Sequence, residues 1–282
     1  TVLKDIQEKN EQIEHVNTLV KKTAQRLEID KRSLRESPIS QGVSWKEKEF
    51  LYPERIVRVA TMFSGIGAIE HAFQRLKLKH EIIFAGDIDE KCRQSYFANY
   101  DIKPENWFTD ARCFNATSYK GKVDLLVGGA PCQAFSMVGR RLGFEDARGT
   151  LFYEFARVIK ESKPKVFIFE NVKGLINHDK GKTWQVIYSI FKELGYDVHF
   201  RILNAKDYGI PQHRERIFCV GFQNPTIFEY PMPIPLEYCM YDFLEDYAYT
   251  KYFLKEKGIK FVTSHKNHEK SYTQINGDVA LC

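Results

Sequence analysis

The chain has 282 residues, of which 43% are apolar, and this length and composition predict one main globular domain with an appendage. It contains no apolar run near the roughly 20 residues that a membrane helix needs, and its charged N-terminal segment does not resemble a signal peptide, so we expect a cytoplasmic protein without a membrane partner. The formal net charge of +5 favours a polyanionic partner, although this excess is modest for a nucleic-acid-binding protein.

The cysteines are scattered along the chain, at Cys92, Cys113, Cys132, Cys219, Cys239 and Cys282. They form no C-x-x-C pair, and no cluster of histidines accompanies them, which argues against a zinc site. We therefore expect free thiols in a reducing compartment and no bound metal.

Residues 1–36 are highly charged and have the pattern of an amphipathic helix. Apolar side chains recur there at intervals of seven, at Ile6, Ile13, Val20 and Leu27. Residues 23–34 place small and apolar side chains where a helix-turn-helix motif needs them, but Glu28 stands at the turn position that usually has glycine. The alternative is a helix that packs on the main domain or on another subunit. Pro38 and the S-P-I-S-Q-G stretch then mark a linker.

Beyond the linker, apolar runs alternate with helix-like segments. The runs predict strands at residues 57–63, 81–86, 123–128 and 166–170, and the helix-like segments lie near 67–78, 90–99, 150–162 and 182–194. This alternation is typical of parallel βαβ units, so we expect an α/β fold with a doubly wound, mostly parallel, Rossmann-like sheet. Two further runs, at 196–203 and 216–222, are joined by a short polar loop and are expected to pair antiparallel at one sheet edge.

In a doubly wound sheet, ligands bind beyond the carboxyl ends of the strands. The first strand ends in F-S-G-I-G, residues 63–67, whose glycines let the backbone approach a ligand. A dinucleotide site prefers G-x-G-x-x-G, and Glu70 occupies the third glycine position, which disfavours NAD. The second strand ends in G-D-I-D, where Asp87 is placed to accept hydrogen bonds from ribose hydroxyls. The two features together favour a nucleoside-containing cofactor without a pyrophosphate.

Further polar residues follow the later strands. Asp110, in W-F-T-D-A, either receives the amine of an adenine or is an ordinary surface acid. The run at 123–128 continues into G-G-A-P-C-Q-A-F-S, which places Cys132 just after a proline-stiffened turn, where a thiolate could act as a nucleophile. The run at 166–170 ends in F-E-N-V, so Glu170 lies at the same edge and needs solvent or a partner. Q-H-R-E-R, residues 212–216, is either a further part of this site or a solvated strand edge.

Taken together, F-S-G-I-G, G-A-P-C-Q-A-F-S, D-A-R-G-T-L-F, E-N-V and Q-H-R-E-R occur in the order and approximate spacing of the bacterial DNA (cytosine-5-)-methyltransferases of restriction-modification systems. The chain resembles that family from about residue 56 to 222. The resemblance implies a methyltransferase sheet, S-adenosylmethionine as methyl donor with S-adenosylhomocysteine as product, and no metal. It also implies a double-stranded DNA substrate and a bacterial, nucleoid-associated location.

The resemblance assigns the catalytic roles. Cys132 would add to C6 of a cytosine flipped out of the duplex, while Glu170 would hydrogen-bond or protonate N3. Arg216 would contact O2, and Arg214 would support Cys132 and its loop. Residues 134–149 would form a lid that closes over DNA phosphates. The DNA contacts expected there and beside it are Gln133, Ser136, Arg140, Arg141 and Arg148.

For the cofactor, the resemblance implies contacts from the glycine-rich turn, the strand ends and the start of a later helix. The residues concerned are Phe63, Ser64, Gly65, Gly67, Asp87, Ile88, Asp110, Ala111, Pro131 and Leu151. Three positions depart from the family pattern: Asp87 stands where Glu is usual, Ile88 where an aromatic often stacks on adenine, and Ala130 where Pro or Phe is common.

We expect three regions: a helical N-terminal extension and linker at 1–48, a catalytic domain at 49–225, and the start of a target-recognition region at 226–282. That recognition region would be completed by further sequence or by a second polypeptide, so the chain alone is expected to show weak or no sequence-specific methylation. The alternatives are a tRNA cytosine-C5 methyltransferase on the same scaffold and a catalytically inactive DNA-binding regulator, although a regulator would have no chemical use for Cys132.

Overall fold

The computed structural model describes residues 52–131, 151–244, 249–269 and 278–281. The N-terminal helix predicted at 1–36, with its helix-turn-helix alternative, lies outside the described residues. So do the predicted lid and Cys132 itself. The described ranges contain the main-domain elements and parts of the segment after them.

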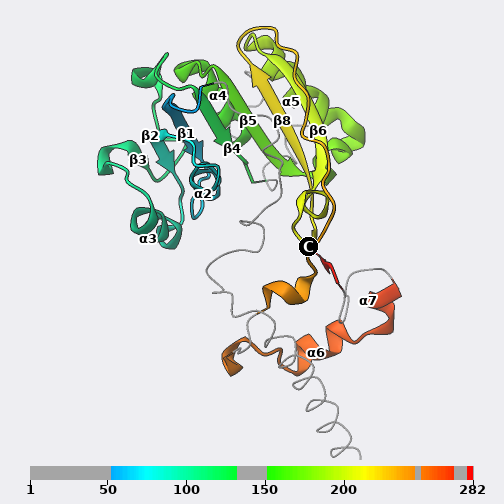
Figure 1. Ribbon diagram of the computed structural model, residues 1–282. Coiled ribbons are helices and arrows are strands. Elements are labelled where there is room, and N and C mark those ends of the chain that lie inside the picture. Colours follow the sequence, from blue (N-terminus) through cyan, green and yellow to red (C-terminus); the bar gives the residue numbers. More distant parts are fainter. Residues whose placement is uncertain (1–51, 132–150, 245–248, 270–277, 282) are drawn as a thin grey trace, which may run out of the picture.

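The centre of the molecule is a seven-stranded sheet with strand order β3-β2-β1-β4-β5-β8-β6 (Figure 1). Its strands are β1 (Val57–Met62), β2 (His80–Gly86), β3 (Trp107–Phe108), β4 (Leu125–Gly128), β5 (Val166–Val172), β6 (Asp197–Asn204) and β8 (Glu215–Phe222). The five strands from β3 to β5 are parallel, and β8 runs antiparallel to both of its neighbours, β5 and β6.

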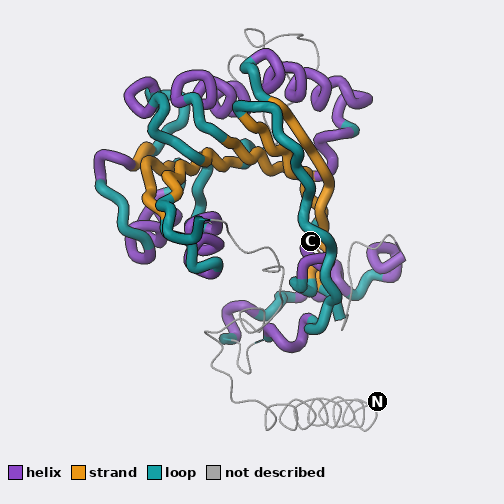
Figure 2. Tube along the Cα trace, turned by 45° about the horizontal axis from the view of Figure 1, so that its top comes forward, coloured by secondary structure: helices purple, strands orange, loops and turns teal. Residues whose placement is uncertain are grey.

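Helices cover both faces of the sheet. Figure 2 shows α4 (Leu151–Ser162) and α5 (Lys182–Glu193) on one face and α2 (Ala68–Arg75) and α3 (Glu90–Asn99) on the other. In α5 the buried side chains recur at helical spacing, so one apolar stripe faces the sheet. The N-terminus of α3 is capped by Asp89, whose side chain accepts a hydrogen bond from the Lys91 amide.

The larger core cluster lies between the sheet and the α4–α5 layer, where aromatic rings dominate. Phe167 and Phe169 of β5 contact Phe155 of α4 and Phe191 of α5, and all four are fully buried. Each such side chain contributes about 1.5–3 kcal/mol by leaving water. Gly221 of β8 is part of this packing, because a Cβ there would lie 2.0 Å from the Phe167 ring.

After β8 the chain leaves the sheet and forms short helical turns, α6 (Glu256–Val262) and α7 (His265–Glu269). It then returns as β9 (Ala280–Leu281), which pairs in parallel with β7 (Gln212–His213). The Ala280 amide donates to the Pro211 carbonyl at 2.8 Å. In Figure 1 this orange-to-red segment lies beyond one end of the sheet, and β9 brings it back beside the Q-H-R-E-R sequence.

The doubly wound, mostly parallel sheet with an antiparallel β6–β8 pair confirms the predicted fold class. The β6–β8 pair lies at one edge of the sheet, as expected, with β6 outermost and β8 between β5 and β6. The sequence did not indicate β3, which has only two residues, or the small β7–β9 sheet. Within the described ranges, no helix combines the length and apolar character needed to cross a bilayer.

Candidate active site

The parallel strands bring the predicted site residues to one edge. The turn that begins at Phe63 follows β1, and Asp87 follows β2. Asp110 follows β3 and Pro131 follows β4, while Glu170 lies near the carboxyl end of β5. Because these five strands run in the same direction, their carboxyl ends form a common ligand-binding edge, as the sequence predicted.

The turn after β1 has an unusual backbone. Phe63, Gly65 and Gly67 have φ values of 56°, 55° and 87°, all in the left-handed region. For a non-glycine residue such as Phe63 this conformation is strained by about 1 kcal/mol or more, and such strain concentrates at functional sites. A Cβ on Gly67 would lie 2.1 Å from the Tyr100 ring, whereas one on Gly65 would meet no described atom within 4 Å. The turn therefore needs Gly67 for packing and leaves open space beside Gly65.

Hydrogen bonds tie this turn to the end of β2. The Ser64 amide donates to the Gly86 carbonyl, and the Gly86 amide donates to Ser64 Oγ, both at 3.0 Å. The next residue, Gly65, donates its amide to Asp87 Oδ2 at 2.9 Å. The Asp87 carboxylate is half-buried and retains lone pairs that could accept ribose hydroxyls. The turn and the acid are thus held in one fixed arrangement.

Two isoleucines give this part of the edge an apolar surface. The side chain of Ile66, within the turn, is 64% exposed, and that of Ile88, next to Asp87, is 70% exposed. Phe63 is half-buried and packs against the larger core cluster. Exposed apolar side chains thus lie next to the Asp87 carboxylate at this edge.

The Asp110 carboxylate already accepts hydrogen bonds from Arg112. Its Oδ1 accepts from the Arg112 amide at 2.9 Å, its Oδ2 accepts from Arg112 Nη2 at 2.7 Å, and these bonds hold the pKa of the carboxyl below its usual range. The neighbouring Ala111 is buried, and its carbonyl accepts from Arg157 Nη2 of α4 at 2.8 Å. Any further donor would therefore share the Asp110 carboxylate with Arg112 or displace it. Leu151, the first residue of α4, is half-buried and packs against the core.

Glu170 and Arg216 form an ion pair across the β5–β8 pairing. Arg216 Nε lies 3.2 Å from Glu170 Oε1. Burial raises the pKa of Glu170 above its usual value, and the positive charges of Arg216 and Arg214 oppose this rise without cancelling it. A carboxyl group with a raised pKa is suited to donate a proton near neutral pH. The predicted grouping of Glu170 with both arginines is therefore present.

The segment that leads to Cys132 is anchored to β5. Asn171 is buried, and its Nδ2 donates to the Ala130 carbonyl at 2.8 Å. A Cβ on Gly129 would lie 2.9 Å from Glu170 Oε2, so the Glu170 carboxylate lies directly beside this segment. Pro131 is exposed and is the last described residue before Cys132. Asn171 lies within the E-N-V motif but is not among the site residues that the sequence predicts.

The positions of the predicted DNA contacts Gln133, Ser136, Arg140, Arg141 and Arg148 lie outside the described residues. Among the residues that the structure does describe, no three His, Cys, Asp or Glu side chains gather as a metal site.

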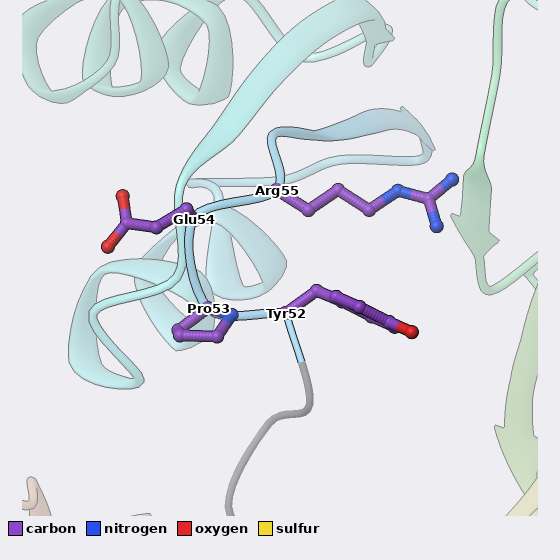
Figure 3. A pocket seen from close by; sticks show the side chains of 4 residues that line it. All are labelled: Tyr52, Pro53, Glu54 and Arg55. Atoms are coloured by element: carbon purple, nitrogen blue, oxygen red, sulfur yellow. The ribbon is translucent and has the colours of Figure 1, made fainter.

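A hollow of about 620 Å³ is lined by Tyr52, Pro53, Glu54 and Arg55. Figure 3 shows the Tyr52 and Arg55 side chains extending to the same side of the backbone. Glu54 forms an ion pair with Lys79, which immediately precedes β2. The hollow therefore lies at the amino ends of β1 and β2, opposite the edge with the site residues, and we assign it no role in the chemistry.

Residues 57–279 match the family model of the C-5 cytosine-specific DNA methylases. The chain belongs to this family. This membership confirms the resemblance noted from the sequence motifs. The match also includes most of the segment after β8, beyond the range in which those motifs occur.

Two curated relatives and one solved structure illustrate what this methylase chain is similar to. It is 43% identical over 171 residues to the orphan methyltransferase M.SPRI of Bacillus phage SPR, covering 61% of the chain and 39% of that protein. It is 42% identical over 218 residues to the type II methyltransferase M.HpaII of Haemophilus parainfluenzae, covering 74% of the chain and 59% of that protein. The chain thus spans about half the length of these relatives.

The solved structure of the Entamoeba histolytica methyltransferase EhMeth superposes with a TM-score of 0.59 at 18% identity, covering 74% of this chain and 66% of that one. This likeness shows a shared methyltransferase fold.

Proposed function

We propose that this chain transfers a methyl group from S-adenosylmethionine to C5 of a cytosine in double-stranded DNA, through a covalent bond between Cys132 and the base. The observation that carries the proposal is the joint position of Glu170, Arg216 and the Ala130–Pro131 segment in a member of the C-5 cytosine methylase family. Glu170 lies beside the chain segment that leads to Cys132, so an acid and a nucleophile could reach the same ring.

The carboxyl edge fits S-adenosylmethionine, which when bound supplies a methyl group on a positively charged sulfur. The open space beside Gly65 would admit its methionine part, and the half-buried Asp87 carboxylate would accept its ribose hydroxyls. The exposed side chain of Ile88 would contact the adenine. Asp110 and the Ala111 backbone would meet the adenine edge.

The chemistry begins from the poor nucleophilicity of cytosine C5. The Cys132 thiolate would form a bond to C6, and the electrons of the C5–C6 double bond would move toward C5 and the N3 side of the ring. Glu170 would supply a proton to N3 and so stabilise the added electron density. After C5 has gained the methyl group, which leaves S-adenosylhomocysteine as the other product, a base would remove the proton from C5. The C5–C6 double bond would form again as the thiolate leaves C6, and N3 would return its proton to Glu170.

The two arginines have separate proposed tasks. Arg216 would direct its guanidinium to cytosine O2 while keeping its ion pair with Glu170, and this pairing would orient the acid. Arg214 would support the Cys132 loop. Its amide donates to Asn204 Oδ1 at 3.0 Å, which fixes the backbone where β8 begins.

A cytosine inside a duplex is out of reach of this edge, so the base would be flipped out, which requires about a few kcal/mol. Contacts of Gln133, Ser136, Arg140, Arg141 and Arg148 with DNA would offset this requirement, and they remain predictions. We further infer that residues 226–282 begin a DNA-reading region that further sequence or a second polypeptide completes. The β7–β9 pairing supports this by placing that segment beside Q-H-R-E-R. Because M.HpaII is a type II methyltransferase, we infer a restriction-modification role.

The test is transfer of a labelled methyl group from S-adenosylmethionine to DNA and to tRNA, followed by digestion to nucleosides. We expect label in 5-methylcytosine from DNA, at a low rate and with weak sequence preference, and none after Cys132→Ala. Label confined to tRNA would instead support the RNA methyltransferase. An absence of label in both substrates, together with no binding of S-adenosylhomocysteine, would contradict the proposal.

A further inference from the structure

A carboxylate with no role in the proposed reaction lies buried beneath the glycine-rich turn. Glu70 of α2 is 0% exposed. Its Oε1 accepts hydrogen bonds from Thr61 Oγ1 of β1 at 2.9 Å and from the Tyr96 hydroxyl of α3 at 2.7 Å. A buried carboxylate requires such donors, and Glu70 therefore joins β1, α2 and α3 just below the turn.

The direction of the hydrogen bonds follows from counting protons. The Thr61 hydroxyl has one proton and gives it to Glu70, so in its 2.8 Å contact with Ser64 Oγ the serine must donate. Ser64 Oγ in turn accepts from the Gly86 amide at 3.0 Å. A one-way chain of donors thus runs from the end of β2 through Ser64 and Thr61, and it ends on the Glu70 carboxylate.

This series of hydrogen bonds determines which atom accepts the proton of the Ser64 hydroxyl. Ser64 Oγ also lies 3.2 Å from the Gly86 carbonyl and could donate there instead. Without an acceptor at Glu70, the Thr61 hydroxyl could donate to Ser64 Oγ instead of accepting from it. The Ser64 hydroxyl could then turn its proton toward the Gly86 carbonyl. The Ser64 hydroxyl would then compete with the Ser64 amide for the same Gly86 carbonyl, and the turn would lose its link to Thr61. This change would shift the turn relative to Asp87, which accepts from the Gly65 amide.

We propose that Glu70 is a positioning residue for the cofactor site, acting through Thr61 and Ser64 on the turn at residues 63–67 and on Asp87. This inference rests on the proposed function, because that function gives the turn a cofactor to bind. It also accounts for Glu70 at the position where a dinucleotide site would have glycine. The Glu70 carboxylate would hold the turn of the cofactor site in place.

The energetic setting supports a role beyond packing. Among the described residues, only two buried side-chain polar atoms have no hydrogen-bond partner, Glu70 Oε2 and Trp107 Nε1. A buried carboxylate with one oxygen unsatisfied is unfavourable for folding, and a well-packed apolar side chain would avoid that loss. Burial and the Glu70 charge both raise the pKa of Tyr96, so its hydroxyl stays protonated as a donor.

The test measures binding of S-adenosylhomocysteine by calorimetry, together with thermal unfolding of each variant. Thr61→Val keeps the side-chain shape but removes the hydroxyl that links Ser64 to Glu70. We expect this variant to bind S-adenosylhomocysteine about tenfold more weakly, or worse. Glu70→Gln keeps an oxygen that can accept both donors, so binding should stay within about threefold of wild type. In methyl-transfer assays, Thr61→Val should raise KM for S-adenosylmethionine and change kcat little.

Trp107→Phe is the control, because it removes the other unpartnered polar atom without touching the turn. It should leave the affinity unchanged even if it shifts the unfolding temperature. Thr61→Val protein that binds as tightly as wild type would overturn the inference, as would a Glu70→Gln variant as impaired as Thr61→Val. Failure of the wild-type chain to bind S-adenosylhomocysteine would instead contradict the proposed function on which the inference rests.

Discussion

Asn171 Nδ2 donates a 2.8 Å hydrogen bond to the Ala130 carbonyl, which joins the end of β5 to the segment two residues before Cys132. Asn171 directly follows Glu170, so one strand end holds the proposed acid and also anchors the segment that precedes the proposed nucleophile. A single buried amide therefore links the strand end that holds Glu170 to the segment that leads to Cys132.

Replacing Asn171 should separate these two functions. In Asn171→Ala the Ala130 carbonyl loses its donor, which lowers the free energy of unfolding by about 1–3 kcal/mol. We expect kcat for methyl transfer to fall by about 10- to 100-fold, because misplacing reacting groups by about 1 Å has effects of this size. Binding of S-adenosylhomocysteine should be retained, since the turn and Asp87 are untouched. The neighbouring exposed residue gives the control Val172→Ala, and equal loss of kcat in both variants would contradict this role.

Glu170→Gln should lower kcat and raise the stability of the folded protein. Glutamine can hydrogen-bond but cannot protonate N3, so kcat should fall by about 10²- to 10⁴-fold. Since burial raises the folded-state pKa of Glu170 above its unfolded value, ionisation of this group opposes folding at neutral pH. The variant should therefore unfold at a higher temperature than wild type at pH 7.

The dependence of this stability gain on pH tests whether ionisation of Glu170 opposes folding. The stability gain of Glu170→Gln should shrink as the pH falls and vanish below about 4.3, where the wild-type carboxyl is protonated in both the folded and the unfolded state. Thermal unfolding of both proteins between pH 4 and pH 8 provides the measurement. A gain that stays constant with pH would show that the ionisation of Glu170 is not its source.

Asp87→Ala should weaken binding of S-adenosylhomocysteine by about 10- to 100-fold, because the variant loses both the acceptor for the ribose and the partner of the Gly65 amide. Asp89→Ala is a matched control two residues away. It removes the N-cap of α3 and should lower stability by about 1 kcal/mol with little change in affinity. Calorimetry on both variants decides the point, and similar losses of affinity would contradict a ribose-binding role for Asp87.

Arg112→Ala should tighten cofactor binding. The arginine side chain donates to both carboxylate oxygens of Asp110, through Nε to Oδ1 and through Nη2 to Oδ2. Its removal would let the pKa of Asp110 rise toward its ordinary value and free acceptors for an adenine amine, while the backbone amide of residue 112 would still donate to Oδ1. A competing contact of this kind lowers the apparent affinity by the fraction of time that it is made, so we expect a gain of about two- to tenfold. Asp110→Ala should weaken binding, and tighter binding by both variants would exclude Asp110 as an adenine contact.

Much of this molecule could be predicted from the sequence, because the patterns involved are long or carry chemistry. The apolar runs at 57–63 and 166–170 gave β1 and β5 within one or two residues. The first strand ends before Phe63 because the backbone turns into the left-handed region there. Glu170 and Arg216 were expected at one edge, and they form an ion pair.

The rest depends on tertiary geometry. The strand β3 has only two residues, too few to show a period, and the place of β8 between β5 and β6 depends on its pairing with both. The bond from Asn171 to Ala130 spans 41 positions, and no spacing rule predicts it. Glu70 was noted only as a missing glycine, since its role requires β1 and α3 to be in place. The hydrogen bonds between Asp110 and Arg112 join residues only two positions apart, so the sequence alone can indicate them.

The proposed reaction depends on a bond between Cys132 and C6 of the target base. The most direct measurement incubates the chain with S-adenosylmethionine and DNA containing 5-fluorocytosine, in which the fluorine at C5 cannot be removed as a proton and the sulfur–carbon bond persists. We predict a protein–DNA adduct that survives denaturing electrophoresis and is absent with Cys132→Ala. An adduct of equal yield in Cys132→Ala, or wild-type chain that methylates ordinary DNA without forming the adduct, would contradict the account.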